Sequence, residues 1–449
     1  MRILTIIITL LLGLDICALN ANAANIVYPK SDNVVINSPE TFFIGNEHLT
    51  KSLKINGEEV EIHPSGGFWH VVKLNPGVNV FKLDNGKEFT TYKITRYIPS
   101  NCLKKDVTTL YETPFWVKTE SDNVPLRSMP NDAGLNRLQH FQKGIPLKII
   151  GEYADFYKVQ LARDDFAWIA KKHVQKADVP DSAKILSYNY SEDASKRHFE
   201  LKLSKKVPYI LSETNGFDLV VYDVLDFPYE KYEFHINKTD KNFGYNTYYT
   251  DDNRLIIDIF NAPKTLMNLR VTIDPGHGGR EYGAIGCLGQ KEKDVNLDIA
   301  FKLKNKLEAA GAKVFMTRTE DKEIGLYDRV EFANKNNSQV FISIHNNALP
   351  DSAAHLKSSG TEVYYFYPQS RALAKAVLKA LICETCLKDN GAKAQSFAVV
   401  RNTNCPAILV EVGYIINPDD NVKLINPEFQ DKAAEGILKG LENYLNDIQ

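Results

Sequence analysis

Residues 265–449 alternate between short apolar runs and longer segments with helical periodicity, and this alternation limits the folds available to the chain. Apolar side chains recur every fourth residue at Val295, Ile299, Leu303 and Leu307, as they do on one face of an α-helix. The pattern predicts an α/β domain with a mostly parallel sheet between helices. We expect strands at 268–273, 313–318, 339–345, 361–367, 397–400 and 407–411, and helices at 292–310, 326–335, 369–387 and 427–446.

A histidine follows the first of these strands. Asp274-Pro275-Gly276 ends the strand, because proline cannot continue the ladder and glycine permits a tight turn. His277 therefore lies at the exit of a strand, where open α/β sheets keep their sites. A single histidine after a turn is more often a surface or core residue, so this position alone does not establish a site.

Three further polar residues lie at the ends of other predicted elements. Glu292 begins a helix, while His345 and Glu411 each end an apolar strand. Two neutral imidazoles and one carboxylate are a common protein set for a catalytic zinc ion, with water in the fourth position. Nitrogen ligands favour zinc over calcium or magnesium. A second carboxylate is then available as general base. In the alternative interpretation, both glutamates are exposed and both histidines are structural.

Several motifs follow one another at ordinary spacings between residues 268 and 447. They are Asp274-Pro-Gly-His-Gly-Gly, Glu292-Lys-Asp-Val-Asn-Leu, Thr317-Arg-Thr with Leu326 and Arg329, Ser343-Ile-His345, Gly360-Thr-Glu362, and PAILVEVGYIIN from Pro406 to Asn417. This region resembles the zinc-dependent N-acetylmuramoyl-L-alanine amidases.

The resemblance implies a site and a reaction. His277, Glu292 and His345 would bind one zinc ion, and Glu411 would be the catalytic carboxylate. The substrate would be peptidoglycan, cut at the amide bond between N-acetylmuramic acid and the L-alanine of the stem peptide. Two other functions stay open: a zinc peptidase acting within stem peptides, and a non-catalytic scaffold that binds the wall.

Polar residues outside this set have less specific expected roles. We expect Asn347 and Glu362 to contact substrate or to support the ligands. Structural ion pairs are expected of Arg318, Asp328 and Arg329.

A short connection predicts how the site is regulated. Some envelope amidases carry a long helical insertion, after the strand that follows the second histidine, which covers the zinc. Here only Pro368 separates Tyr367 from a helix beginning near Gln369. We therefore expect an open site that needs no activator protein.

The first residues have the pattern of a secretory signal peptide. A largely apolar run, 3–12, follows Met1-Arg2, and Ala21-Asn-Ala23 supplies small residues for cleavage, so residues 1–23 are expected to be removed. A retained membrane anchor is disfavoured by the shortness of the run and by Asp15. We expect export to the periplasm or cell envelope, or secretion, and no transmembrane segment after cleavage.

Composition fits an exported protein with several domains. A length of 449 residues suggests about two to four domains. A net charge of −2 provides no basic field for nucleic acid or for a membrane surface. Five of the six cysteines remain once Cys17 leaves with the signal, so at least one thiol is free or pairs outside the chain. Cys383 and Cys386 have metal or redox spacing, but partly buried positions on a helix are expected.

Three β-rich modules are expected before the α/β domain. Residues 24–97 contain short strand-like runs separated by turns such as Asn56-Gly57, and they resemble the immunoglobulin-like modules of exported bacterial enzymes. A linker is expected at 98–117, and another at 177–183. Residues 184–264 are again β-rich and resemble the wall-targeting (AMIN-like) β-domains found ahead of some amidases.

The middle module, residues 118–176, resembles bacterial SH3 domains. The resemblance is carried by Val124-Pro-Leu-Arg127 near its start and Trp168-Ile169 near its end. It implies attachment to the peptide part of the wall. Aromatic residues either line a peptide groove or fill a small core, and the candidates are Tyr153, Phe156, Tyr157 and Trp168.

Overall fold

The computed structural model describes residues 23–98, 107–213, 216–223, 231–237, 242–353 and 358–447. The chain divides into two compact units, Met1–Ile98 and Pro99–Gln449. Only Ala23 of the expected signal peptide belongs to the described residues. Cys17 and Cys102 lie outside them.

Two sheets enclose the core of the first unit. One has the order β1-β3-β6 and the other β2-β8-β7-β4-β5. Asn56 and Gly57 both have positive φ angles in the turn between β4 and β5, as the Asn-Gly pair predicts. The sequence did not predict β1 or β3, and the assignment to an immunoglobulin-like family stays a prediction. The strands are β1 (Asn25–Tyr28), β2 (Asn33–Ile36), β3 (Glu40–Asn46), β4 (Lys54–Ile55), β5 (Glu58–Glu59), β6 (Gly67–Lys73), β7 (Gly77–Asp84) and β8 (Phe89–Arg96).

The second unit begins with one strongly bent sheet of order β11-β10-β14-β13-β12-β9-β15. The linker expected at 98–117 is wrong for its last part, because β9 pairs there with β12 and β15. Apolar side chains in β9, among them Phe115 and Val117, join the core and fix that strand in place. The strands are β9 (Thr109–Thr119), β10 (Val124–Arg127), β11 (Arg137–Phe141), β12 (Pro146–Tyr153), β13 (Phe156–Gln160), β14 (Phe166–Ala170) and β15 (Val174–Ala177).

Two further sheets follow, of order β16-β17-β22-β21 and β18-β19-β20. A single hydrophobic cluster runs from the β9–β15 sheet into these two sheets, with Phe141 against Tyr209 at a centroid distance of 6.2 Å. Ala183, in the linker expected at 177–183, is part of this cluster. The two β modules therefore share one core. The strands are β16 (Ile185–Glu192), β17 (Lys196–Leu203), β18 (Tyr209–Glu213), β19 (Gly216–Tyr222), β20 (Lys231–Asn237), β21 (Asn242–Tyr249) and β22 (Arg254–Asn261).

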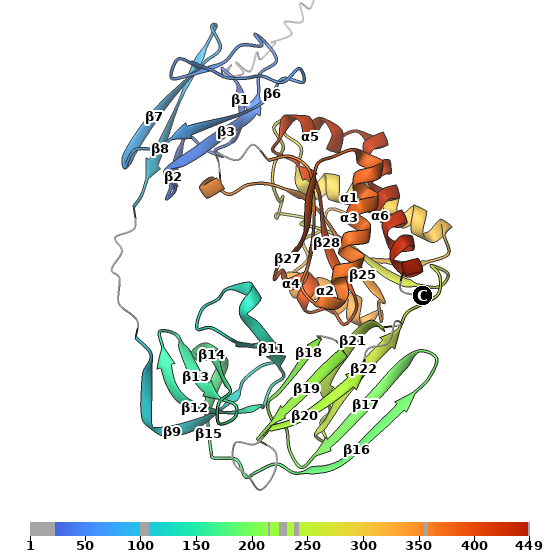
Figure 1. The fold of residues 1–449 in the computed structure, drawn as a ribbon. Helices are drawn as coiled ribbons and strands as arrows, with labels where there is room; N and C mark the ends of the chain where they lie inside the picture. The colour runs from blue at the N-terminus through green and yellow to red at the C-terminus, as the bar shows by residue number, and fades with distance from the viewer. Residues whose placement is uncertain are drawn as a thin grey trace, which may run out of the picture. The chain divides into compact units, whose positions relative to one another are not determined.

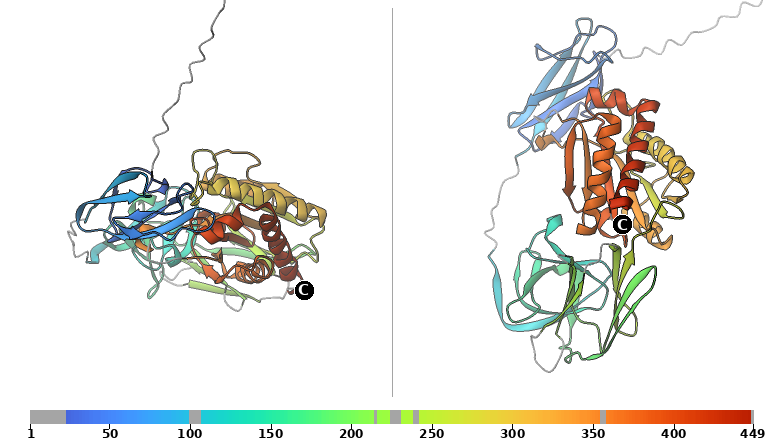
Figure 2. Two further views of the ribbon diagram at one scale, coloured as in Figure 1. Left: turned by 90° about the horizontal axis from the view of Figure 1, so that it is seen from above. Right: turned by 45° about the vertical axis from the view of Figure 1, so that its right-hand side comes forward.

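The C-terminal domain has the predicted α/β architecture (Figure 1, Figure 2). Its sheet has the order β24-β23-β25-β28-β26-β27, parallel throughout except that β26 runs antiparallel to β28. Helices α1, α3 and α6 pack together on one face, and α2 and α4 lie on the other. The strands are β23 (Arg270–Pro275), β24 (Lys313–Met316), β25 (Val340–Asn347), β26 (Thr361–Tyr365), β27 (Asp389–Ala394) and β28 (Ala407–Tyr414); the helices are α1 (Glu292–Ala309), α2 (Leu326–Lys335), α3 (Arg371–Thr385), α4 (Ala398–Arg401), α5 (Pro418–Leu424) and α6 (Pro427–Asp447).

One predicted element of this domain is wrong. The run at 397–400 was expected to be a strand, but residues 398–401 form α4. Val399 and Val400 are buried, and a short apolar run of this kind does not distinguish a buried helical turn from a strand. The edge strand β27 and the helix α5 were not predicted.

The cysteine pair also differs from expectation. Cys383 near the end of α3 and Cys386 just after it are exposed, not partly buried, and both thiols are free. No helix within the described ranges is long and apolar enough to cross a membrane.

Candidate metal centre

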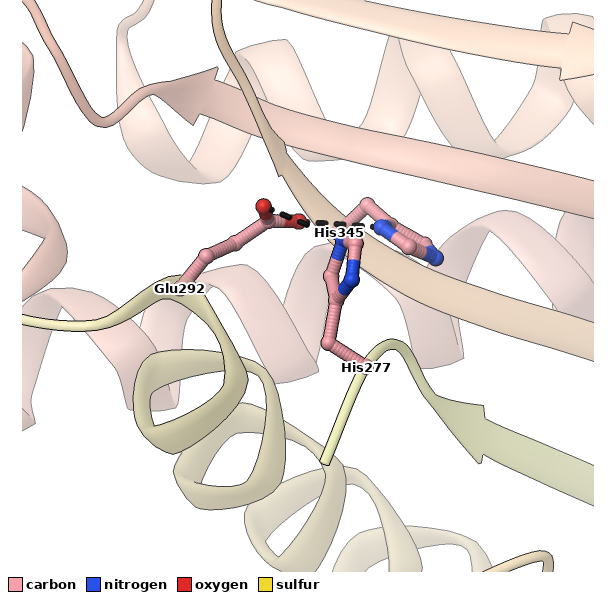
Figure 3. Close-up of side chains that lie close together, drawn as sticks. All are labelled: His277, Glu292 and His345. Atoms are coloured by element: carbon pink, nitrogen blue, oxygen red, sulfur yellow. Dashed lines mark hydrogen bonds and ion pairs between the residues drawn. The ribbon is translucent and has the colours of Figure 1, made fainter. Parts of the chain in front are cut away.

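Three predicted ligands converge at the carboxyl-terminal edge of the sheet (Figure 3). The candidate ligand atoms of His277, Glu292 and His345 all lie within 4.8 Å of one another. Glu292 Oε2 is 3.2 Å from His277 Nε2, and Glu292 Oε1 is 2.9 Å from His345 Nδ1. The two imidazole rings meet edge to face, with centroids 4.9 Å apart. The structure therefore brings together the three side chains predicted as ligands.

Two glycines have no side chain where one would collide with His277, Glu292 or His345. A Cβ atom at Gly276 would lie 2.2 Å from the imidazole of His345. A Cβ at Gly283 would lie 2.3 Å from Glu292 Oε2 and 2.7 Å from His277 Cδ2. His277 itself has a φ of 61°, an uncommon value for a residue with a side chain, which turns the chain sharply after β23. The loop is thus built around the three side chains.

Glu292 is the first residue of α1 and its side chain is buried. Its Oε2 accepts a hydrogen bond from Ala284 N at 2.8 Å, and its Oε1 accepts one from Asn346 N at 3.2 Å. Burial would raise the pKa of this carboxyl, but hydrogen bonds from His277 and His345 outweigh burial and hold the pKa well below its usual range. The positive end of the helix dipole favours the same charge. Glu292 is accordingly a carboxylate at neutral pH.

Two arginines hold the backbone around His277. Arg329 donates to Pro275 O and His277 O at 2.9 and 2.8 Å, and it pairs with the buried Asp274 at 2.8 Å. Arg318 donates to Pro275 O and Gly276 O at 3.0 and 2.9 Å. Arg329 thus forms an ion pair as expected. The ion pair expected of Arg318 is wrong, because its hydrogen-bond partners are backbone carbonyl groups.

Asp328 differs from this expectation. It is exposed at the first turn of α2, and it makes no ion pair with any described residue.

Glu411 lies beside His345 in the parallel pair of β25 and β28. Its Oε2 atom is buried and has no hydrogen-bond partner among the described residues. Burial, followed by the nearby charges of Glu292 and Glu362, raises the pKa of Glu411 well above its usual value. An isolated buried carboxylate oxygen is costly unless something occupies its lone pairs. The atom is therefore available to a water molecule or substrate at the centre.

Glu362 and Asn347 lie next to this carboxylate, as expected of supporting residues. Glu362 is buried and accepts from Lys393 Nζ at 2.8 Å and from Tyr414 OH at 3.0 Å. It also accepts from Tyr364 OH and, at 3.4 Å, from Asn347 Nδ2. These four donors occupy the oxygens of the Glu362 carboxylate.

Several supporting side chains were not predicted. Asn346 donates to Asn296 Oδ1 at 2.7 Å, and Asn296 donates to Gly276 O at 3.2 Å. Asn296 lies four residues after Glu292, on the same face of α1, and this spacing was a usable signal. Lys393 gave no such signal, because its strand was not predicted.

The donor set fits a zinc ion. Two imidazole nitrogens and one carboxylate, with space left at the exposed side of the cluster, match the ligands of catalytic zinc. The side chain of His277 is 30% exposed and that of Glu292 only 6%, so the cluster reaches solvent mainly through His277. The space beside the three side chains exists because Gly276 and Gly283 have no Cβ atom.

Comparisons with known proteins agree with the geometry. Residues 271–443 match the family model described as N-acetylmuramoyl-L-alanine amidase. Protein YqiI of Bacillus subtilis (strain 168), described as uncharacterized, is 38% identical over 187 residues, which cover 41% of this chain and 88% of YqiI. The chain belongs to the N-acetylmuramoyl-L-alanine amidase family. The predicted amidase domain, with hydrolysis of a peptidoglycan amide bond as its reaction, is thereby confirmed.

Other members share the same region. N-acetylmuramoyl-L-alanine amidase LytC of Bacillus subtilis (strain 168) is 36% identical over 174 residues, covering 39% of this chain and 35% of LytC. The solved catalytic domain of CwlV, an N-acetylmuramoyl-L-alanine amidase from Bacillus (Paenibacillus) polymyxa var. colistinus, is 37% identical, with a TM-score of 0.38, covering 40% of this chain and 98% of that structure. The chain thus spans about a third of LytC.

Proposed function

We propose that His277, Glu292 and His345 bind one zinc ion, and that Glu411 is the general base for hydrolysis of the N-acetylmuramoyl-L-alanine amide bond in peptidoglycan. The observation that carries this proposal is the convergence of the three ligand atoms within 4.8 Å. When bound, zinc would supply Lewis-acid chemistry, acidifying a water molecule and polarising the amide carbonyl.

The protein's own groups account for the proton transfers. Glu411 Oε2, which no described residue hydrogen-bonds, would take the proton from the attacking water. The same oxygen would then give that proton to the leaving nitrogen of L-alanine. The raised pKa of Glu411 supports this second step, because a carboxyl that holds its proton more firmly is a better acid-base shuttle near neutral pH.

We also propose that the site works without an activator protein. Between β26 and α3 there is only the short helical turn Pro368–Ser370, which leaves no room for an occluding helix at that point. If the pure full-length enzyme were silent on purified wall until a partner protein was added, this proposal would be wrong.

The remaining parts of the chain would direct the enzyme to its substrate. We propose that residues 1–23 are a signal peptide and that the enzyme hydrolyses peptidoglycan in the cell envelope. The β modules would attach the enzyme to the wall. In the module resembling SH3 domains, Phe156 is buried in the core, while Trp168 and Tyr153 form a half-buried edge-to-face pair at 6.3 Å. That pair is the better candidate for a wall contact.

The test compares Glu411→Ala with the parent enzyme on purified peptidoglycan. The variant should fold and retain zinc but release stem peptides at least roughly 10²-fold more slowly, which is the usual effect of losing a general base. Glu308→Ala, which removes a surface carboxylate of α1, is the control and should match the parent.

Mass spectrometry of the released products then identifies the bond. Peptides that begin with L-alanine indicate the amidase, whereas cuts within the stem peptide indicate a zinc peptidase. Parent-like rates in Glu411→Ala would remove the role assigned to Glu411. A full absence of products from the parent would favour a non-catalytic scaffold.

A further inference from the structure

A second cavity lies at the opposite edge of the catalytic sheet from the metal centre. It has a volume of about 750 Å³. Its lining comes from β11, β21 and α2, and from residues 122–123, 367–369 and 401–404. Residues 401–404 in its wall precede β28, whereas Glu411 lies towards the other end of that strand. From Ala407 to Glu411 the strand rises about 13 Å. None of the three proposed ligands lines the cavity, so it is a separate site.

The wall of this cavity contains a concentration of unsatisfied polar atoms. Arg401 Nε, Thr403 Oγ1 and Gln369 Oε1 are each buried and make no hydrogen bond to any described residue. Buried polar groups in folded proteins are almost always paired. Three such atoms from two separate segments around one cavity therefore indicate a polar ligand that binds there.

The buried part of the wall is also cationic. Arg401 is buried and spends one nitrogen on Ser396 O at 2.7 Å. Arg137 is not among the lining residues, but its Nη1 contacts Nε2 of the lining His140 at 3.2 Å. Burial and the charges of Arg401 and Arg127 lower the pKa of Arg137 to about 10. Burial and the same arginines lower the pKa of His140, in the cavity wall, to about 3, so this imidazole is neutral.

The nearby acidic groups are exposed and partly neutralised. The side chain of Asp132 is 74% exposed and pairs with Arg127 at 3.1 Å. Glu331 is 59% exposed and pairs with Lys335 at 2.6 Å. Asp122, at the edge of the cavity, is exposed as well. The acidic residues that line the cavity are Asp122 and Glu331, and both are exposed, so neither is a buried partner for Arg401.

The other lining residues suit a peptide. Tyr245 and Tyr367 form an edge-to-face pair at 6.0 Å, and Gln139, Asn246 and Asn334 also line the cavity. Amide groups hydrogen-bond peptide backbone, and aromatic rings pack against its side chains. The volume falls within the range of about 300–1,000 Å³ typical of ligand pockets.

We propose that this cavity binds a short peptide by its free carboxylate, with Arg401 donating to the carboxylate and Thr403 hydrogen-bonding beside it. Arginine is the residue best suited to a carboxylate, because its planar group can donate two parallel hydrogen bonds. In a wall hydrolase the available source of such a group is an uncrosslinked stem peptide. The site would hold a neighbouring peptide while the metal centre acts elsewhere on the same polymer. The identification of the ligand as a stem peptide rests on the proposed function. The proposal that the cavity binds a carboxylate does not rest on it.

Calorimetric titration of the full-length Glu411→Gln protein tests the proposal without any turnover. The probes are a synthetic stem pentapeptide with a free carboxyl terminus, the same peptide with a C-terminal amide, and inorganic phosphate. We expect saturable binding of the acid and at least roughly tenfold weaker binding of the amide, since a hydrogen bond to a charged group is lost.

Three further substitutions in that protein locate the binding. Arg401→Gln should weaken binding of the acid at least roughly tenfold, with Arg401→Lys restoring part of it. Thr403→Val removes an unpaired buried hydroxyl, so it should weaken binding about two- to tenfold without lowering the melting temperature. Lys439→Gln, which removes a positive charge from α6, should bind like the parent. If Arg401→Gln does not fold, Thr403→Val decides.

Each other outcome contradicts the proposal. Equal affinity for acid and amide, or binding unaffected by Arg401→Gln and Thr403→Val, would place the peptide elsewhere, for example in the catalytic cleft. If none of the probes bound saturably, the unpaired groups of the cavity would be hydrogen-bonded by ordered water and the proposal would be wrong. Phosphate that displaces the peptide with the same dependence on Arg401 would identify a general oxyanion site and overturn the peptide as its occupant. None of these results depends on whether the metal centre is active.

Discussion

Glu362 lies directly opposite Glu411 in the antiparallel pair of β26 and β28. Two carboxyl groups on facing residues of adjacent strands repel each other when both are ionised. The charge of Glu362 is held by Lys393 and two tyrosine hydroxyls, so Glu411 is the partner whose pKa rises. The pKa of Glu362 is therefore lowered while that of its neighbour Glu411 is raised.

Glu362→Gln should shift the acid side of the pH–activity profile to lower pH. Glu411 acts as a base only when ionised, and activity falls as the pH drops through its pKa. Removing the Glu362 charge and freeing Lys393 both lower the pKa of Glu411, so ionisation persists to more acidic solution. The kcat/KM profile on wall fragments measures the shift, with Glu308→Gln as control. An unchanged acid limb, or one moved upward, would rule out electrostatic coupling between the two residues.

Gly276→Ala should reduce zinc affinity. The new Cβ would lie 2.2 Å from the His345 imidazole, which must then move out of the cluster. Gly413→Ala is the matched control, because its Cβ would meet neighbours at ordinary distances of 3.4 Å or more. Zinc content after dialysis against a weak chelator measures the difference. Equal zinc retention in the two variants would show that the His345 position is not limited by Gly276.

Asp274→Asn should destabilise the α/β domain at neutral pH and less so in acid. Burial alone would raise the pKa of Asp274, but Arg329 and hydrogen bonds from Thr317 and Ser343 outweigh it, so the folded pKa lies below the usual 3.8. Such a group stabilises the fold above its unfolded pKa, and that contribution disappears as the pH falls through the folded value. Breaking a buried pair costs about 3–5 kcal/mol at neutral pH.

Differential scanning calorimetry of the full chain at several pH values measures this effect. The gap between Asp274→Asn and the parent should narrow below about pH 3.8. Asp389→Asn, on the exposed edge strand β27, should follow the parent throughout. A gap that stays constant down to pH 2 would mean that Asp274 is not ionised in the folded protein.

Removal of zinc should abolish peptide release. Phenanthroline should stop the reaction, and added zinc should restore it, whereas magnesium and calcium should not, because the donor set contains two imidazole nitrogens. His345→Ala should purify with little zinc and stay inactive after zinc is added. Full activity in the presence of chelator would exclude a role for the metal in the reaction.

The cluster of His277, Glu292 and His345 was predictable because each of these residues marks a change in local structure. His277 follows a strand at a proline-glycine break, Glu292 begins a periodic helix, and His345 ends an apolar run. The carboxyl ends of parallel strands meet at one edge, so placement followed from topology. The pairing of Glu362 with Glu411 could not be foreseen in the same way. It depends on β26 running antiparallel, and no local pattern records strand direction.

Short or weakly patterned elements were missed for a related reason. The strand β27 reads Asp-Asn-Gly-Ala-Lys-Ala, which has few strand-forming residues, and it is held by pairing with β26. The core shared by the two central β modules was equally hidden, because it arises from contacts such as Phe141 with Tyr209. The cavity proposed to bind a peptide could not be foreseen either, because its lining residues come from six separate segments.

The uninterrupted hydrophobic cluster that joins β9–β15 to β16–β22 has a consequence for how this chain can be divided. Dividing the chain near residue 177 would expose apolar surface on both fragments, so we expect neither fragment to be soluble and folded by itself. Residues 107–261 would therefore be exchanged between related enzymes, in the laboratory or by recombination, as a single cassette.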